Sequence, residues 1–415
     1  MQVIGIIAEY NPFHRGHRWQ LNELRRRFPH TDGIVIVMSG SITQRGMPCI
    51  LDKWTRAVHA IQGGADLVIE LPFVFACRSA QDFARGGISL LSKLGIITRL
   101  AFGMEAENLA HLSAIAAQID TNEIQRQIGV HIGKGASYST ALTHALIKKD
   151  ISEPILRAPN NILAIEYLRA LHRYAPKIAP IAIQRTAVGH SDETLHMGIT
   201  SASSIRAELG TPAPLWENLQ KSVMPTVFRD LRSAYRKGLP SEDALLPLIR
   251  YAFLTLDAAA LQDIYSVTEG IENRMRQMLH TAVRYDDFLT TMATKRYTRS
   301  RIARLSTYLL IQLQKEYVAH FDSCGSAYIR PLAFNVRGRD LLRQMKGTAQ
   351  LPIINRVAKF LTTDQRSMKM SDLSVLQQML SFDTRATELR LLTLPTRTPL
   401  SYRTDFVVSP HFSSE

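Results

Sequence analysis

Short apolar runs recur along the first half of the chain, separated by turn residues and by longer amphipathic stretches. Runs that are apolar throughout are typical of strands buried on both faces of a parallel sheet. They predict strands at residues 3–8, 33–38, 66–72, 98–103 and 181–185. Helical spacing of apolar residues predicts the intervening helices. The first begins near residue 17, and the others span residues 53–62, 80–94, 108–149 and 162–172. This alternation predicts an α/β fold, a Rossmann-like doubly wound parallel sheet.

The pattern changes after residue 210. The segment Gly210-Thr211-Pro212-Ala213-Pro214 is a cluster of turn residues. Beyond it helical periodicity dominates, most clearly at residues 242–254 and 269–279. We therefore expect an α/β domain at residues 1–210, followed by a mainly helical C-terminal domain at residues 215–415.

The turn after the first strand holds the strongest candidate for chemistry, Glu9-Tyr10-Asn11-Pro12-Phe13-His14-Arg15-Gly16-His17. Open α/β sheets bind ligands beyond the carboxyl ends of their strands, where a helix N-terminus offers N–H groups to an anion. His14 and His17 are therefore candidate donors to phosphate oxygens, and Gly16 would let the backbone approach closely. The alternative is two ordinary histidines at a helix start.

A second phosphate candidate is Thr200-Ser201-Ala202-Ser203-Ser204-Ile205-Arg206. Its hydroxyl groups cap a predicted helix, and Arg206 follows one turn later, near the same anion-binding end. Ser203 and Arg206 are the residues we expect to contact phosphate. A simple helix cap is the alternative.

Further candidates follow the other strands. Gln44, Arg45 and Lys53 follow the second strand and are candidates to reach the phosphates or the acceptor, with ordinary solvated charges as an equal alternative. Gly103 follows the fourth strand, where a base or ribose would pack on bare backbone, unless it is a plain turn glycine. The Asn160-Asn161 pair precedes a helix, as a cap or as a reader of an adenine edge.

Charge changes the picture of the partner. The 415 residues include 50 Lys and Arg against 36 Asp and Glu, a net charge of +14, which favours a polyanion such as nucleic acid over most partners, with membrane surfaces as the competing anion. Three widely spaced cysteines support neither a disulfide framework nor a metal site, and no metal ligands are predicted. No apolar run approaches the roughly 20 residues that span a bilayer, so we expect a cytoplasmic protein.

A basic run at residues 295–304 is the candidate RNA contact. It contains five basic residues, no acidic residue and Tyr297, which is available for base stacking. We expect RNA contact from Lys295, Arg296, Arg299, Arg301 and Arg304. A solvated helix face is the alternative, and secondary candidates are Arg330, Arg337, Arg339, Arg343 and Lys346.

Two resemblances connect these motifs. His14-x-Gly16-His17 resembles the HxGH signature of the HIGH-superfamily nucleotidyltransferases, whose members carry a similar Ser/Thr-rich segment ending in Ile-Arg. A wider set resembles the tRNA(Met) cytidine acetate ligase family over most of the chain: residues 9–17, Met38-Ser39-Gly40, Gln44-Arg45-Gly46-x-Pro48, residues 66–72, Pro159-Asn160-Asn161-Ile162-Leu163, Lys295-Arg296-Tyr297-Thr298 and residues 328–335.

The family resemblance implies an ATP-dependent tRNA-modifying ligase. Acetate and ATP would give acetyl-adenylate and pyrophosphate, and the N4 amine of the wobble cytidine of elongator tRNA(Met) would take the acetyl group, without acetyl-CoA. His14, His17 and Arg206 would be catalytic, and Mg²⁺ would accompany ATP. ATP contacts would come from Ile7, Ala8, Glu9, Tyr10, Asn11, Pro12, Phe13, His14, Gly16, His17, Gly103, Asn160 or Asn161, Arg185, Ser203 and Arg206.

Two other functions fit parts of the sequence. A small-molecule adenylyltransferase of coenzyme biosynthesis would share the HxGH and Ser/Thr-Ile-Arg segments, although it would not need some 200 extra residues with a basic face. A non-catalytic, nucleotide-dependent RNA-binding protein would share the basic run. The oligomeric state stays open.

Overall fold

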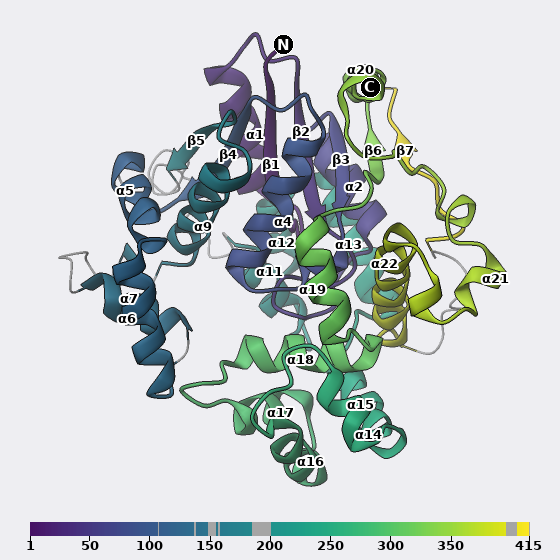
Figure 1. Ribbon diagram of the computed structural model, residues 1–415. Coiled ribbons are helices and arrows are strands. Elements are labelled where there is room, and N and C mark those ends of the chain that lie inside the picture. The colour runs from purple at the N-terminus through teal and green to yellow at the C-terminus, as the bar shows by residue number, and fades with distance from the viewer. Residues whose placement is uncertain are drawn as a thin grey trace.

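The computed structural model describes residues 1–106, 108–136, 138–147, 155–156, 158–184, 201–395 and 405–414. Within these residues one seven-stranded sheet runs in the order β5-β4-β1-β2-β3-β6-β7 (Figure 1). The pairs β5–β4, β4–β1, β1–β2 and β2–β3 are parallel, as the apolar runs predicted, and the doubly wound fold is confirmed. The strands are β1 (Val3–Ala8), β2 (Gly33–Ser39), β3 (Leu67–Leu71), β4 (Arg99–Met104), β5 (Ala179–Gln184), β6 (Pro331–Phe334) and β7 (His411–Phe412).

The two faces of the sheet bury separate hydrophobic cores, because successive residues of a strand point to opposite faces. Ile34 and Ile36 of β2 face one core, and Val35 and Val37 face the other. The first core is covered by α1 (Arg15–Arg27), α2 (Lys53–Gln62), α11 (Ala202–Leu209), α12 (Trp216–Ser222) and α13 (Pro225–Lys237). The second is covered by α3 (Phe73–Ala76), α4 (Ala80–Lys93), α5 (Leu109–Ile119), α6 (Asn122–Gly133), α7 (Tyr138–Ile147) and α9 (Pro159–Tyr174).

The second half of the chain is mainly helical, as its periodicity predicted. Its helices lie below the lower ends of the strands in Figure 1 or along one side of the sheet. They are α14 (Leu245–Thr255), α15 (Ala258–Asp263), α16 (Ile271–Thr281), α17 (Tyr285–Met292), α18 (Arg299–Ile311), α19 (Lys315–Cys324), α20 (Val336–Thr348), α21 (Thr363–Arg366) and α22 (Val375–Leu392), with short 3₁₀ turns at Glu242–Ala244, Val357–Lys359 and Met370–Asp372. None of the described helices is long and apolar enough to cross a bilayer.

The second half also extends the sheet, which the sequence pattern did not predict. β6 pairs antiparallel with β3, and β7 pairs parallel with β6. A cluster of buried charges fastens this edge: Lys53 Nζ lies 2.6 Å from Glu70 Oε1 and 2.5 Å from Asp405 Oδ1, and Arg330 contacts the same two carboxylates at 2.9 and 2.5 Å. The two halves therefore share one sheet, and a boundary at residues 210–215 stays a prediction.

Candidate active site

The candidate site lies at the carboxyl edge of the sheet, where the strand order reverses. β1 is central, with β2 on one side and β4 on the other. The chain proceeds from β1 to β2 and β3, and then returns to the opposite side of β1 as β4. The crevice beyond the ends of β1 and β4 is therefore the topological switch point, where open α/β sheets bind ligands. Residues 9–14 lead from β1 into α1 at this point.

The two histidines of the HxGH motif form the start of α1. His14 is the N-cap residue, and its Nδ1 accepts a hydrogen bond from Gly16 N at 3.1 Å. His17 Nδ1 accepts from His14 N at 3.3 Å, and the two imidazoles stack with centroids 3.7 Å apart. Because Nδ1 is the acceptor in each ring, a neutral imidazole must carry its hydrogen on Nε2. Nε2 is thus the atom that each ring can offer to a phosphate oxygen.

Gly16 is required by the packing of His14. A Cβ atom on Gly16 would lie 2.9 Å from His14 Cε1, which is closer than real Cβ atoms approach other heavy atoms, and 3.1 Å from His14 Nδ1, which is tighter than most real contacts. Any side chain here would therefore push the His14 ring off its cap. The predicted close approach of the Gly16 backbone to a phosphate stays a prediction, and the structure shows a different reason for glycine here, the packing of the His14 imidazole.

Aromatic packing holds the turn itself in place. Tyr10 and Phe13 are buried and pack edge to face with centroids 4.9 Å apart, and His17 lies 4.7 Å from the Tyr10 ring. Tyr10 has a left-handed backbone conformation, with φ of 49°. Asn11 is also buried, and its Oδ1 accepts a hydrogen bond from Ile50 N at 2.9 Å. The turn is therefore a rigid support for the histidines.

The second phosphate motif meets this turn. Ser201 caps α11 by accepting from Ser204 N at 3.1 Å, and Ser203 Oγ lies 2.8 Å from Ser201 Oγ. The exposed Arg206 donates from Nη1 to Asn11 O at 2.7 Å, across 195 residues of chain. The structure thus brings Arg206 to the HxGH turn, as the two sequence motifs predicted. Thr200 and Arg185 lie outside the described residues.

The asparagine pair belongs to the loop after β4. The buried Asn161 accepts from Glu105 N and Ala106 N, each at 2.9 Å, and donates from Nδ2 to Ile155 O at 3.2 Å. The half-buried Asn160 donates to Glu105 Oε1. The oxygen and the nitrogen of the Asn161 side-chain amide are both hydrogen-bonded to backbone atoms of the protein. Asn160 is therefore the better candidate for contact with a ligand. Gly103 is the penultimate residue of β4 rather than a residue beyond it.

A buried arginine that sequence reasoning missed holds the strand ends together. The fully buried guanidinium of Arg56 donates to Glu9 O at 2.5 Å, to Ser39 O at 3.1 Å, to Leu51 O at 3.2 Å and to Gly40 O. It joins the ends of β1 and β2 below the candidate site. The sequence did contain a signal for this role. Arg56 follows Lys53 by three residues and therefore lies on the same inward face of a short helix.

The loop after β2 supports the site less directly than expected. Lys53 cannot reach a ligand, because it is fully buried between Glu70 and Asp405; this expectation was wrong. Gln44 N donates to Glu9 Oε1 at 2.5 Å, and Gln44 Nε2 donates to Arg78 O at 2.5 Å, so this side chain braces the loop. Arg45 is exposed.

The basic run at 295–304 adjoins this loop. A Cβ atom on Gly46 would lie 2.6 Å from Arg304 N, and Thr307 Oγ1 donates to Gly46 O at 2.9 Å. The middle of α18 therefore packs against the loop after β2. Two of its predicted RNA contacts are already paired, Arg296 with Glu269 and Arg299 with Asp286.

The other predicted RNA contacts differ in how exposed their side chains are. Arg301 lies over the Tyr297 ring, with 4.5 Å from its guanidinium carbon to the ring centroid, and Lys295 is exposed. The secondary candidate Arg330 is buried with Glu70 and Asp405, so its expected RNA contact was wrong.

Two of the three cysteines, Cys49 and Cys77, are buried near this edge. Burial raises the pKa of the Cys49 thiol and raises that of Cys77 to about 12, so both stay protonated at neutral pH. Within the described ranges, no group of three or more His, Cys, Asp or Glu side chains is placed to hold a metal ion.

Comparison with known proteins agrees with this geometry. The model of the HIGH Nucleotidyl Transferase family matches residues 1–404. The chain is 33% identical to the tRNA(Met) cytidine acetate ligase of Syntrophomonas wolfei, with 99% of each chain covered. It is 37% identical to that of Latilactobacillus sakei, with 86% and 88% covered. The crystal structure of Thermotoga maritima TmcAL bound with alpha-thio ATP superposes with a TM-score of 0.87, at 28% identity and full coverage of both chains.

The matched region includes the HxGH turn, Arg206 and the basic run, so the similarity extends across the whole candidate site. The chain belongs to the HIGH nucleotidyl transferase family and, within it, to the tRNA(Met) cytidine acetate ligases.

Proposed function

We propose that the protein activates acetate with ATP and transfers the acetyl group to N4 of the wobble cytidine of elongator tRNA(Met), forming N4-acetylcytidine. The contact of Arg206 with the turn that carries His14 and His17 is the observation that supports this most directly. It gathers two imidazoles and a guanidinium at a helix N-terminus, in the crevice where this fold class binds nucleotides. The names of the relatives supply the acetate, the cytidine and the tRNA.

The first step forms acetyl-adenylate. A carboxylate oxygen of acetate attacks the α-phosphorus of ATP, and the bond from that phosphorus to the β-bridging oxygen breaks, releasing pyrophosphate. Negative charge accumulates on the phosphate oxygens. The Nε2–H groups of His14 and His17 and the guanidinium of Arg206 are preorganised cationic or dipolar donors for that charge. Mg²⁺ bound to ATP would neutralise part of it.

The second step transfers the acetyl group. The cytidine N4 amine attacks the acetyl carbonyl carbon, the carbon–oxygen bond to AMP breaks, and N4 loses a proton. AMP is the leaving group, so no thioester is needed and acetyl-CoA has no place in the sequence of steps.

A two-part assay tests this function. Protein, ATP, Mg²⁺ and acetate should release pyrophosphate, and addition of an elongator tRNA(Met) transcript should yield N4-acetylcytidine, measured by mass spectrometry of the digested RNA. Acetyl-CoA in place of ATP and acetate should give no product. Pyrophosphate release with a coenzyme precursor but not with acetate would instead favour the small-molecule adenylyltransferase.

A further inference from the structure

Helix α13 carries a basic face for which the activity described so far gives no role. We define this face as Arg229, Arg232, Arg236 and Lys237. Spacings of three, four and seven residues place the first three on one side of the helix, opposite the buried Val227 and Leu231. All four side chains are exposed. The face lines a surface groove of about 430 Å³ together with Phe228 and Ser233.

These charges are largely unpaired. Among the described residues, no hydrogen bond or ion pair is recorded for the guanidinium of Arg232 or Arg236 or for the ammonium of Lys237. Arg229 makes one long contact, 3.4 Å to Asp230 on the same helix. Asp230 is itself turned toward α2, where its Oδ2 lies 2.9 Å from His59 Nε2. In the 295–304 run, by contrast, two of five charges are neutralised by acidic neighbours.

A purely structural explanation covers only part of the face. Cations near a helix C-terminus interact favourably with the helix dipole, which accounts for Arg236 and Lys237 in the last turn. It does not account for Arg229 and Arg232, which lie in the middle turns of the helix. Four cations on one face repel one another, so an anionic partner would relieve a cost that the helix carries alone.

An aromatic group accompanies the face. Trp216 packs edge to face against Tyr235 at 5.2 Å and against Phe228 at 6.0 Å, and the Arg232 guanidinium carbon lies 5.9 Å from the Trp216 ring centroid. Cations that follow a phosphate backbone and aromatic rings that stack on bases are the two features of single-stranded nucleic-acid sites.

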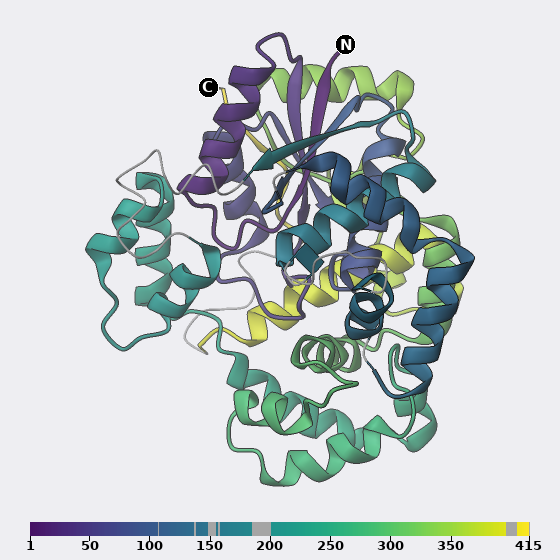
Figure 2. The same cartoon turned by 90° about the vertical axis from the view of Figure 1, so that its left-hand side faces the viewer.

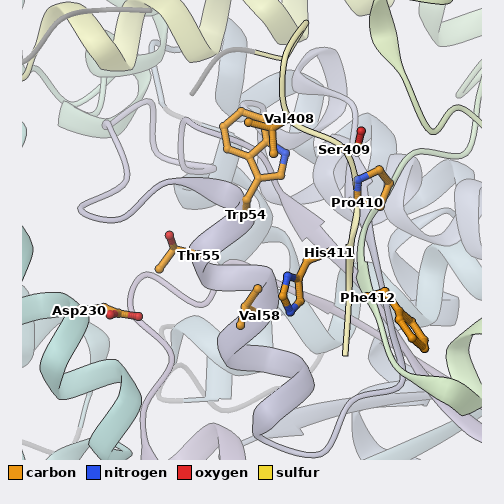
Figure 3. A pocket seen from close by; sticks show the side chains of 9 residues that line it. All are labelled: Trp54, Thr55, Val58, Asp230, Val408, Ser409, Pro410, His411 and Phe412. Atoms are coloured by element: carbon orange, nitrogen blue, oxygen red, sulfur yellow. The ribbon is translucent and has the colours of Figure 1, made fainter. Parts of the chain in front are cut away.

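The placement of α13 relates this face to the candidate active site. α13 follows α11, which carries Arg206, and Asp230 fixes it to α2 beside a pocket of about 450 Å³ between α2 and residues 408–412 (Figure 3). In Figure 2, α11 to α13 lie on the left of the lower ends of the strands, and α14 to α18 lie beneath them. α13, which carries the basic face, and α18, which contains most of the 295–304 run, thus lie on two sides of the carboxyl edge of the sheet (Figure 2).

We propose that the α13 basic face binds the phosphate backbone of the tRNA while its wobble cytidine is at the active site. This inference rests on the proposed function. Each phosphate neutralised by a lysine or arginine releases counterions, so log affinity falls with log salt by a slope of roughly 0.7 to 0.9 per contact. Neutralising three of the four cations should therefore reduce the slope by about two.

The test compares triple variants of the full-length protein. Arg232→Gln/Arg236→Gln/Lys237→Gln removes the face, and Arg356→Gln/Lys359→Gln/Arg366→Gln removes two arginines and one lysine around α21, including one arginine over an aromatic ring. Fluorescence anisotropy with labelled tRNA(Met), between about 50 and 200 mM salt, gives affinity and slope. The α13 variant should bind at least about tenfold more weakly with a smaller slope, and the α21 variant should match the unaltered protein.

A charge-preserving variant separates charge from structure. Arg232→Lys/Arg236→Lys should keep most of the affinity, because a phosphate contact needs the cation rather than the planar guanidinium. Equal affinity and slope for the α13 triple variant and the unaltered protein would overturn the inference, as would equal losses in both triple variants. If the α13 triple variant does not fold, the single change Arg236→Glu replaces it. This variant should also bind tRNA at least about tenfold more weakly, and unchanged affinity and salt slope would overturn the inference.

Acetate-dependent ATP–pyrophosphate exchange distinguishes this inference from the proposed function. If the α13 triple variant still catalyses acetate-dependent ATP–pyrophosphate exchange but binds tRNA more weakly, the result supports both the proposed function and the inference about α13. If the unaltered protein neither exchanges pyrophosphate with acetate nor binds tRNA, the proposed function fails. If it does both and the α13 variant binds equally well, only the inference fails.

Discussion

His17 links local structure to chemistry through its two ring nitrogens. Nδ1 accepts from His14 N and helps to start α1, and in the neutral ring Nε2 carries the hydrogen. The sequence motif placed this residue at the strand-to-helix turn, and the structure agrees. What the motif did not reveal is that the two rings stack and share the cap, since this depends on side-chain orientation at the first turn.

Replacing His17 with Ala should slow acetate-dependent pyrophosphate release by about 100-fold, the scale of losing one preorganised donor to a developing charge. Removing the Nδ1 acceptor should cost only about 1 kcal/mol of stability, so the melting temperature should fall modestly. His30→Ala, at an exposed histidine before β2, is the matched control and should be fully active. Near-normal turnover of the His17 variant would remove it from the catalytic residues.

Gly16→Ala tests whether the cap geometry matters apart from the imidazoles themselves. The new methyl group would displace the His14 ring, and we expect at least about tenfold slower pyrophosphate release together with a loss of about 1 kcal/mol of stability. Gly129→Ala in α6 is the control, because nothing lies within 4 Å of its Cβ position. It should raise stability by roughly 0.5 to 1 kcal/mol and leave turnover unchanged. Equal behaviour of the two variants would contradict a role for Gly16.

Residues whose partners lie far along the chain were the ones predicted wrongly. Lys53 and Arg330 look like accessible cations in the sequence, yet both are buried against Glu70 and Asp405. Asp405 is 352 residues from Lys53 in the numbering, so no local pattern could reveal the pairing. A buried cation is stable only with such partners.

At the scale of elements, the long apolar strands were predicted closely and the short edge strands were missed. β1 to β5 are mostly apolar, and α2 spans the residues that its periodicity indicated. β6 begins with Pro331 and β7 has two residues, so neither carries a strand signal. The pairing of β6 with β3 is accompanied by contacts such as Asn335 N to Asp66 O, at 3.0 Å, which are not local, and β7 in turn pairs with β6.

Helix α22 is joined through Asp383 to the start of α3 and to the segment before β6, and this contact should make stability depend on pH. Asp383 accepts from Phe73 N at 2.7 Å and from the Tyr328 hydroxyl. Burial, reinforced by the charge of Glu70, raises the pKa of Asp383 to about 7. The folded state thus favours the protonated carboxyl. That stabilisation is complete below the unfolded pKa near 4 and is lost as pH rises toward 7.

Asp383→Asn should remove this dependence, since the amide mimics the protonated acid. The free energy of unfolding of the unaltered protein, relative to that of the variant, should fall between about pH 4 and 7 by at most about 1.4 kcal/mol per pH unit. Denaturant melts across this range measure the difference. A difference that is constant with pH, or that grows as pH rises, would contradict the raised pKa.

At the scale of the whole molecule, the basic composition predicted a polyanionic partner such as nucleic acid but not where the charge is available. Lys and Arg exceed Asp and Glu by 14. Folding places some of this excess in buried clusters, such as Arg56 among backbone carbonyls, and pairs other cations with acidic neighbours. A run of consecutive cations in the sequence therefore suggests more available surface charge than the folded protein has. Cations spaced three or four residues apart, as in α13, gather on one helix face, and the sequence suggests less surface charge there than the folded protein has.

The 295–304 run should contribute less to tRNA binding than its five basic residues suggest, because two of them are paired with acidic side chains. Because Arg299 is paired with Asp286, neutralising Arg299, Arg301 and Arg304 to Gln should weaken tRNA binding and reduce the salt slope by roughly 1.4 to 1.8, less than for the α13 face. Asp286→Asn should do the reverse and strengthen binding, since it frees the Arg299 guanidinium for a phosphate. Acetate-dependent pyrophosphate exchange should persist in both variants, because the proposed ATP site is formed by β1, α1 and α11. Unchanged affinity and slope in the triple variant, with no gain from Asp286→Asn, would show that this run is only a solvated helix face and would leave α13 as the principal tRNA contact.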